Sequence, residues 1–472
     1  MSTAQIESPL AGLSAEQIEQ LGEEFDAIHD EVYGDLGERD RAYITNIIAM
    51  HRRIVVFARV MMLASRYKPA WIAGTASLSA AKILENMEIG HNVMHGQWDW
   101  MNDPKIHSST WDWDTASTKE AWKHSHNYIH HTYTNIRGKD KDLGYEIMRI
   151  DPHQKWHPVY LLQPAYNALL MLLFEWGVAV HDMDIEAVRA GEKAPKEVVK
   201  DFKGIAGKAR LQIQKDYIAW PLLSGLAMSA LDLALNHKEL GAARGGRFGR
   251  VTSRLGRVRT SRAERILQDV LAVVVQTGGR QFKSTLIANV VANVVRNVWT
   301  HSIIFCGHFP DQTYTFSQEE TEGEERGQWY VRQLTGAANI EGGPMFHIAS
   351  GNLGYQVEHH LYPDMPSTRY AEIAPRVKDI CQRYGLPYNT GPFSQQLFMV
   401  HRTIARLAFP GGKPRPKPGP YRGTDVTGPS AKNGHGSTDG NTGPSGSGPE
   451  QQDEGVRFSM PSDGKGAEGD AG

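Results

Sequence analysis

The chain has 472 residues, 40% of them hydrophobic and 22% charged, enough for roughly two to four domains and a sizeable core. Its 51 basic and 53 acidic side chains give a net charge of −2, so no overall field favours nucleic acid as a partner. Two cysteines exclude a disulfide framework and an iron–sulfur cluster formed by this chain alone. Histidine is the unusual component, because seven of the 20 histidines lie between residues 91 and 131.

Both ends of the chain differ from its middle. Residues 1–40 are acidic, lack the pattern of a secretory signal, and show amphipathic helical spacing from Ser14 to Val32. Residues 411–472 are rich in Gly, Pro and Ser and almost free of aliphatic side chains, a composition that predicts disorder. We therefore expect an acidic amphipathic N-terminal segment (1–40), a main domain (41–410) and a disordered tail (411–472).

Several apolar windows predict long helices in the main domain. A membrane-crossing helix needs about 20 mainly apolar residues, more than the usual core helix of about 11–12. The windows are Ile54–Leu84, typical of a helical hairpin that turns near Lys68-Pro69, and His157–Val180, Tyr217–Leu235, Leu267–Val275 and Ser284–Gly307. They favour an all-α fold, a polytopic membrane helical bundle, over the alternative of buried helices in a soluble all-α protein.

An arginine-rich tract interrupts this pattern. Eight arginines fall within the 25 residues from Gly241 to Arg265, inside an insertion at about 237–283. Such a tract is typical either of a patch for anionic lipid headgroups or an acidic partner, or of a solvated loop.

Three histidine groups follow apolar or polar helical segments. They are His91-Asn-Val-Met-His95, then His126-Asn-Tyr-Ile-His130-His131 with His124 just before it, and Gln356-Val-Glu-His359-His360. A spacing of four places two imidazoles on one helical face, and His131 lies about 100° round from His130, where it could reach a second metal.

The number of imidazoles bears on the metal. Any one group is a weak signal, but two His-His doublets and an HxxxH in one chain exceed what a single tetrahedral zinc uses. Neutral imidazole suits iron, copper, nickel and zinc. We therefore predict two metal ions, and two irons on an apolar scaffold indicate dioxygen chemistry.

The window that ends at Gly307, together with His308 directly after it, contains polar residues that share one helical face. At 100° per residue, Asn297, His301 and His308 lie within about 40° of one another around a helix. Polar side chains in a membrane helix usually face the bundle interior. We predict that His308 is a further ligand, and that Asn297 and His301 are ligands or lie next to them.

Taken with their flanks, these groups resemble the membrane fatty-acid desaturase family, and within it the actinobacterial acyl-CoA desaturases of the stearoyl-CoA type. The motifs that carry the resemblance span residues 45–400: ENMEIGHNVMHGQWDWMNDP, HSHNYIHHTYTN, LLQPAYN with EWG, RNVW with IFCGHFPD, and GNLGYQVEHHLYPDMPS. The resemblance implies a helical membrane fold with a cytosolic helical cap that carries a di-iron centre.

Carried over by position, the resemblance also implies the iron ligands. These would be His91, His95, His126, His130, His131, His308, His359 and His360, with no catalytic residue separate from them. Gln356 stands where many relatives have a histidine and is a possible ligand or neighbour of the metals, as are His301, Asn297 and His124.

The implied reaction is the oxygen-dependent insertion of a cis double bond, at the delta-9 position, into a long-chain fatty acyl-CoA. The chain has no nucleotide-binding fingerprint and too few cysteines for an iron–sulfur cluster, so electrons from NADPH would come through a separate flavin and iron–sulfur reductase. The expected location is the bacterial inner membrane, among lipids, with the active site facing the cytosol and no nucleic-acid partner.

Alternatives stay open at this point. A hydroxylase or ketolase on the same di-iron scaffold, acting on alkane, sterol or carotenoid, also begins with hydrogen abstraction. A metal-handling membrane carrier and a soluble metalloprotein are more distant possibilities. For a one-sided site, an even number of crossings must separate the second and third histidine groups. Three long windows lie between them, beginning at His157, Tyr217 and Ser284, and a short one begins at Leu267, so at least one must be interfacial or re-entrant.

Overall fold

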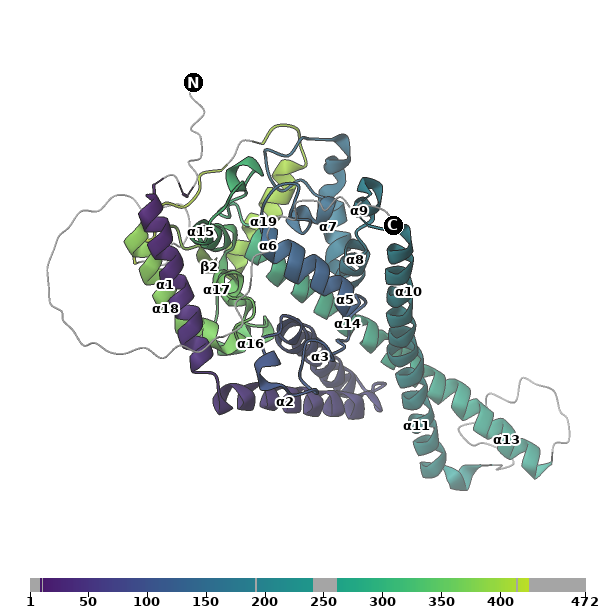
Figure 1. The fold of residues 1–472 in the computed structure, drawn as a ribbon. Coiled ribbons are helices and arrows are strands. Elements are labelled where there is room, and N and C mark those ends of the chain that lie inside the picture. The colour runs from purple at the N-terminus through teal and green to yellow at the C-terminus, as the bar shows by residue number, and fades with distance from the viewer. Residues whose placement is uncertain (1–8, 11, 192, 241–260, 413–414, 424–472) are drawn as a thin grey trace, which may run out of the picture. The chain divides into compact units, whose positions relative to one another are not determined.

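The computed structural model describes residues 9–10, 12–191, 193–240, 261–412 and 415–423. Most of the arginine-rich tract and most of the predicted tail lie outside the described residues. The regular secondary structure of the described part is helical apart from two short strands, β1 (Asn339–Glu341) and β2 (Thr390–Pro392), which pair in parallel. This confirms the all-α fold class (Figure 1).

The N-terminal helix α1 (Ala15–Gly34) forms where the spacing predicts it. Ser14 caps it, and Ser14 and Gln17 exchange the two hydrogen bonds of a capping box. Its apolar face is buried against α15 (Arg326–Gly336) and α18 (Tyr370–Tyr384). The approach to α15 requires glycine, because a Cβ on Gly327 would lie 1.9 Å from the Ile18 carbonyl oxygen.

The predicted helical hairpin is also present. Helix α2 (Glu38–Met62) and helix α3 (Lys68–Leu84) pack against each other, and Pro69 stands in the first turn of α3, where its missing N–H costs nothing. Helix α3 continues as a π-helical segment, Glu85–His91, and ends in α4 (Asn92–Met94).

The window from His157 to Val180 is not one helix, and in this the prediction was wrong. It contains a 3₁₀ segment (Pro158–Leu162) and two short helices, α7 (Gln163–Leu172) and α8 (Phe174–His181), with a break at Leu173. Leu173 has non-helical angles of φ −114° and ψ 29°. Neither helix reaches the length that a bilayer crossing requires.

Two long helical stretches follow. Helices α10 (Pro195–Gln212) and α11 (Trp220–Leu235) join through a π-helical segment into one stretch, Pro195–Leu235, of 41 residues, which is long and apolar enough to cross a membrane. It is the one such helix among the described residues, so the polytopic bundle remains a prediction. The second stretch joins α13 (Arg262–Val273) to α14 (Gly279–His308), and α14 packs on α3 and α11.

The rest of the chain forms a cap around the end of α14. It contains α15, α16 (Pro344–Ala349), α17 (Gln356–Leu361), α18 and α19 (Phe393–Leu407), and its core includes Tyr330, Leu361 and Tyr362. Tyr421 is buried in the same core and packs on Tyr388, so the folded part continues past residue 410, where the tail was predicted to begin. The remaining short helices are α5 (Lys119–Trp122), α6 (His131–Tyr133) and α9 (Ile185–Ala190).

Candidate metal centre

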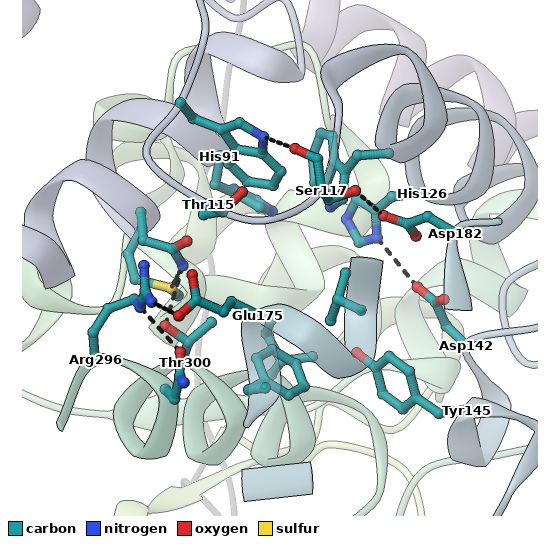
Figure 2. A pocket seen from close by; sticks show the side chains of 18 residues that line it. His91, Thr115, Ser117, His126, Asp142, Tyr145, Glu175, Asp182, Arg296 and Thr300 are labelled. Atoms are coloured by element: carbon teal, nitrogen blue, oxygen red, sulfur yellow. Dashed lines mark hydrogen bonds and ion pairs between the residues drawn. The ribbon is translucent and has the colours of Figure 1, made fainter. Parts of the chain in front are cut away.

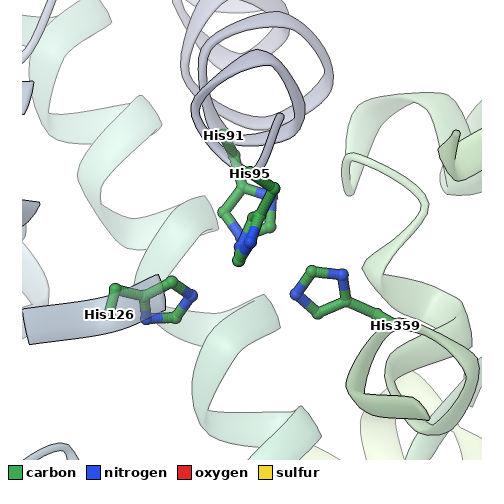
Figure 3. Close-up of side chains that lie close together, drawn as sticks. All are labelled: His91, His95, His126 and His359. Atoms are coloured by element: carbon green, nitrogen blue, oxygen red, sulfur yellow. The ribbon is translucent and has the colours of Figure 1, made fainter. Parts of the chain in front are cut away.

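Seven of the eight predicted ligands fall into two groups. The first group is His91, His95, His126 and His359, and the second is His130, His308 and His360; in each, one nitrogen per ring lies within 4.8 Å of every other. Figure 3 shows the first group, with His91 and His95 descending from one helix end toward His126 and His359. Residues more than 200 positions apart in the sequence therefore converge.

The π-helical geometry explains how the second histidine motif serves both groups. His126 and His130 lie in the π-helical segment Lys123–His130, and π segments are often found at functional sites. Their rings stack at 5.1 Å, as the spacing of four predicts, yet His126 belongs to the first group and His130 to the second. His126 and His130 also lie together with Asp142 in a third group of possible ligands.

His131, the eighth predicted ligand, lies between the two groups. Its ring centre is 4.8 Å from that of His95 in the first group and 4.6 Å from that of His360 in the second. It is buried, and neither of its ring nitrogens has a hydrogen-bond partner among the described residues.

Five of the imidazoles have a polar partner at Nδ1, the ring nitrogen that points away from the group. The partners are Asn92 Oδ1 for His91 (3.0 Å), Asp142 Oδ2 for His126 (3.2 Å), Asp140 Oδ1 for His130 (3.0 Å), Tyr370 Oη for His359 (3.1 Å) and Gln333 Oε1 for His360 (3.1 Å). An acceptor at Nδ1 holds the proton there and leaves the Nε2 lone pair free, the arrangement usual for metal-bound histidine.

The other hydrogen bonds of Tyr370 and Gln333 show independently that each of them accepts a hydrogen bond from its histidine Nδ1. The Tyr370 hydroxyl donates to the Tyr362 carbonyl at 3.0 Å, so it accepts from His359. Gln333 donates its amide N–H to the His131 carbonyl at 2.9 Å, so its oxygen faces His360.

Five of the nitrogens that point inward are unpartnered. The Nε2 atoms of His95, His126, His130, His131 and His359 are buried and have no hydrogen-bond partner in the described part of the chain. A buried polar atom without a partner costs about 1–3 kcal/mol, and here several such atoms face a common space. The residues present therefore fit a centre with metal ions bound to imidazole nitrogens.

Burial and neighbouring charges shift the pKa values of the histidines in and near the second motif in different directions. Burial and the neighbouring imidazoles hold the pKa of His131 well below its usual range, so it is neutral and able to bind a metal. Burial also lowers the pKa of His130, but Asp140 outweighs this and raises it. Against the same effect of burial, a hydrogen bond from His181 to Asp142 at 3.0 Å raises the pKa of His181 to about 9.

The four residues named as possible ligands or neighbours have different positions. Gln356 lies at the second group, where its amide nitrogen donates to His308 Nε2 at 3.1 Å. His301 stands outside both groups and contacts Asn167 Oδ1 at 3.0 Å. Asn297 donates to the Leu172 carbonyl at 2.9 Å, and His124 is exposed and stacks on Tyr128.

Four partners of the imidazoles that lie outside the histidine motifs were not anticipated from the sequence: Asp140, Asp142, Gln333 and Tyr370. The pair Asp140-Lys-Asp142 begins nine residues after His131, the last residue of the second motif, and such a doublet after a histidine motif is a usable signal. Gln333 and Tyr370 come from α15 and α18, and nothing in the local sequence marks them.

A cavity adjoins the first group. It has an empty volume of about 680 Å³, part of it open to solvent, and His91 and His126 belong to its wall. Most of the remaining wall is apolar, with Trp113, Phe174 and Ile304 among its residues (Figure 2). A cavity of this kind fits a long apolar ligand beside the histidines.

Comparisons with known proteins show similarity to fatty acid desaturases. A family model described as fatty acid desaturase matches residues 201–392. The NADPH-dependent stearoyl-CoA 9-desaturase of Mycobacterium tuberculosis is 42% identical over 403 residues, which cover 85% of this chain and 82% of the relative. The sn-1 linoleoyl-lipid 6-desaturase of Synechocystis is 23% identical over 345 residues, 72% of this chain and 79% of the relative.

A shorter match is to the human fatty acid desaturase 3, which is 32% identical over 117 residues, 25% of this chain and 24% of the relative. No solved structure matches the chain. The chain belongs to the fatty acid desaturase family, and the enzyme is an oxidoreductase.

Proposed function

We propose that this enzyme inserts a cis double bond into a long-chain fatty acyl-CoA, at the delta-9 position, with two iron ions held by the histidine groups. The observation that carries the proposal is the set of buried, unpartnered imidazole nitrogens that converge beside an apolar cavity. The mycobacterial relative, whose name states a stearoyl-CoA 9-desaturase that depends on NADPH, supports the substrate, the position and the source of electrons.

The two histidine groups would divide the metals between them. His91, His95, His126 and His359 would hold one iron, His130, His308 and His360 the other, and His131 lies within reach of both. Iron bound there would supply dioxygen activation, which removal of hydrogen from an unactivated methylene requires and side chains cannot provide.

The protein's own residues orient and enclose the reaction. Asp140, Gln333 and Tyr370 fix the ring orientation of three imidazoles through their Nδ1 atoms. Trp113 and Phe174 in the cavity wall would exclude water and hold the chain in place, so that one pair of carbons faces the metals.

The lengths of the helices support a membrane location with a cytosolic site. Helices α7 and α8 are too short to cross a membrane. Two long stretches, Pro195–Leu235 and 262–308, therefore separate the second histidine motif (His126–His131) from the third (Gln356–His360). Pro195–Leu235 is long and apolar enough to cross a membrane, and a second crossing by 262–308 would return the chain to the same side, which a site built from both motifs requires. Electrons from NADPH would arrive through a separate flavin and iron–sulfur reductase, because the two cysteines, Cys306 and Cys381, are too few for a cluster.

The test is iron content together with the fatty-acid profile of a bacterial host that expresses the chain with a matched reductase. We expect about two irons per chain and new monounsaturated acids, with the position of the double bond read by mass spectrometry. The variant His130→Ala, His131→Ala should lose both, whereas His401→Ala, an exposed histidine outside both groups, should lose neither. Iron with hydroxylated lipids would instead indicate the hydroxylase reaction, and absence of iron would overturn the proposal.

A further inference from the structure

The wall of the cavity beside the first histidine group contains a buried ion pair, apart from the carboxylates Asp142 and Asp182 that also line it. Glu175 on α8 and Arg296 on α14 form an ion pair there, and their side chains are only 3% and 2% exposed. We propose that this ion pair is the stop that sets the length of acyl chain the enzyme accepts; the proposal rests on the acyl-CoA desaturase function above.

The pair is held rigidly. Gln212 donates to both carboxylate oxygens of Glu175 at 3.1 Å. Arg296 donates from Nη1 to the Asp114 carbonyl at 3.1 Å and from Nε to Asn297 Oδ1 at 3.0 Å. Four separate segments therefore fix the two charged groups, and movement of either would break several hydrogen bonds in a buried place.

The position of the pair suits a stop. Arg296 precedes the predicted ligand His308 by 12 residues in one continuous helix, which is about 18 Å along the helix axis. In Figure 2, Arg296, Glu175 and Thr300 lie together on the side of the cavity away from His126 and Asp142. Asn86 donates to Thr300 at 3.1 Å and adds a further polar contact in this part of the wall.

The apolar rest of the wall explains why the ion pair would limit the length of the acyl chain. Beside Met87, Trp113, Phe174 and Val178 each added methylene of an acyl chain gains free energy, because it leaves water for an apolar surface. At the ion pair the gain ends, since a longer chain would have to separate two buried charges. Separation would leave each charge without its partner, which is strongly unfavourable in a buried place.

A second buried ionic group nearby offers a matched control. Arg59 on α2 binds Asp216 at 3.1 Å and Asn289 at 2.7 Å, but it is not part of the cavity wall. Asp216 also binds Lys82 at 2.8 Å, so Arg59→Met removes a buried arginine and leaves Asp216 with a cation.

The experiment compares saturated acyl-CoAs of increasing chain length with the iron-loaded full-length protein and its reductase. Both kcat/KM and binding are measured, the latter by the ligand-induced rise in melting temperature. The double variant Glu175→Ala, Arg296→Ala removes both charges together and opens the wall. We expect it to raise kcat/KM for chains beyond the wild-type limit, relative to the preferred length, by about tenfold or more, the usual scale for one methylene in an apolar pocket.

Two further variants serve as a milder test of the stop and as a control. Arg296→Lys keeps the charge with a slimmer head and should shift the limit in the same direction by less, which tests the stop even if the double variant fails to fold. Arg59→Met should leave the chain-length profile unchanged. A profile that is the same in wild type, Arg296→Lys and the double variant would overturn the stop. A binding limit that moves with the variants, in a protein that forms no olefin, would support the stop and overturn the proposed reaction.

Discussion

Two regions of this molecule bury many polar side chains between helices, and they do so in opposite ways. In the first, Arg59, Lys82 and Asp216 connect α2, α3 and the long helix Pro195–Leu235. Asp216 accepts from Arg59 at 3.1 Å and from Lys82 at 2.8 Å, so each cation faces an anion. In the second, the histidine centre, five Nε2 atoms point inward without a hydrogen-bond partner among the described residues.

The difference separates a structural network from a binding site. An ionic network in which each charge is paired connects the helices that contain it and leaves no unpaired charge for a ligand to bind. A group of unpartnered lone pairs makes the folded chain less stable until something binds there, and its outer hydrogen bonds hold the rings ready. Burial alone would not distinguish the two regions; the direction and partners of the polar atoms do.

The largest effect on function is expected in the histidine centre. His359→Ala removes a ring from the first group while Tyr370, its Nδ1 partner, keeps its bond to the Tyr362 carbonyl. We expect olefin formation to fall by more than about 100-fold, beyond the effect of losing an outer partner, and bound iron to fall by at least half. Iron analysis and product chromatography measure both. A variant with full iron content would remove His359 from the ligand set.

The reverse result is expected in the ionic network. Asp216→Asn leaves Arg59 without its carboxylate and weakens the hold on Lys82, so stability should fall by about 3–5 kcal/mol, the cost of breaking a buried pair. Thermal unfolding in detergent measures the loss, with Asp379→Asn, an exposed carboxylate, as the control. Iron per folded chain should not change, and a loss of iron without a loss of stability would contradict the separation of the two regions.

A smaller effect is expected from the outer hydrogen bonds of the histidine centre. Asp140→Asn keeps the shape of the side chain but removes the carboxylate that accepts from His130 Nδ1 at 3.0 Å. We expect iron to be retained about 10–100-fold more weakly, as for other partners of metal-bound histidine. A chelator titration of the purified protein measures this. Equal retention in the variant and the wild type would show that the contact does not orient His130.

Several helices and the first histidine motif could be predicted from the sequence, because their signals are local. The capping residues of α1 and the turn of the α2–α3 hairpin depend on neighbours within a few residues, and so does the facing of His91 and His95. The sequence did not predict that His126 also joins the first group while His130 joins the second, because a π-helical segment changes the angle between residues without a mark in the sequence.

Contacts that form only through tertiary packing could not be predicted from the sequence. Gln333 and Tyr370 meet the histidines only after α15 and α18 fold over them. His301 shows the limit of helical periodicity: it shares a face with His308, but seven residues are about 10.5 Å along the axis. His301 therefore contacts Asn167 two turns away from the second group.

The smallest effect should come from His124, which tests the comparison inside a single π-helical segment. His124 and His126 are two residues apart, but His124 is exposed and stacks on Tyr128 at 5.8 Å, whereas His126 belongs to the first group. We expect His124→Ala to change stability by less than about 0.5 kcal/mol, as is usual for surface positions, and to leave iron content and products as in wild type. His126→Ala, measured in parallel, should lose iron. Equal losses in both variants would mean that the whole segment, and not the direction of the individual rings, determines metal binding.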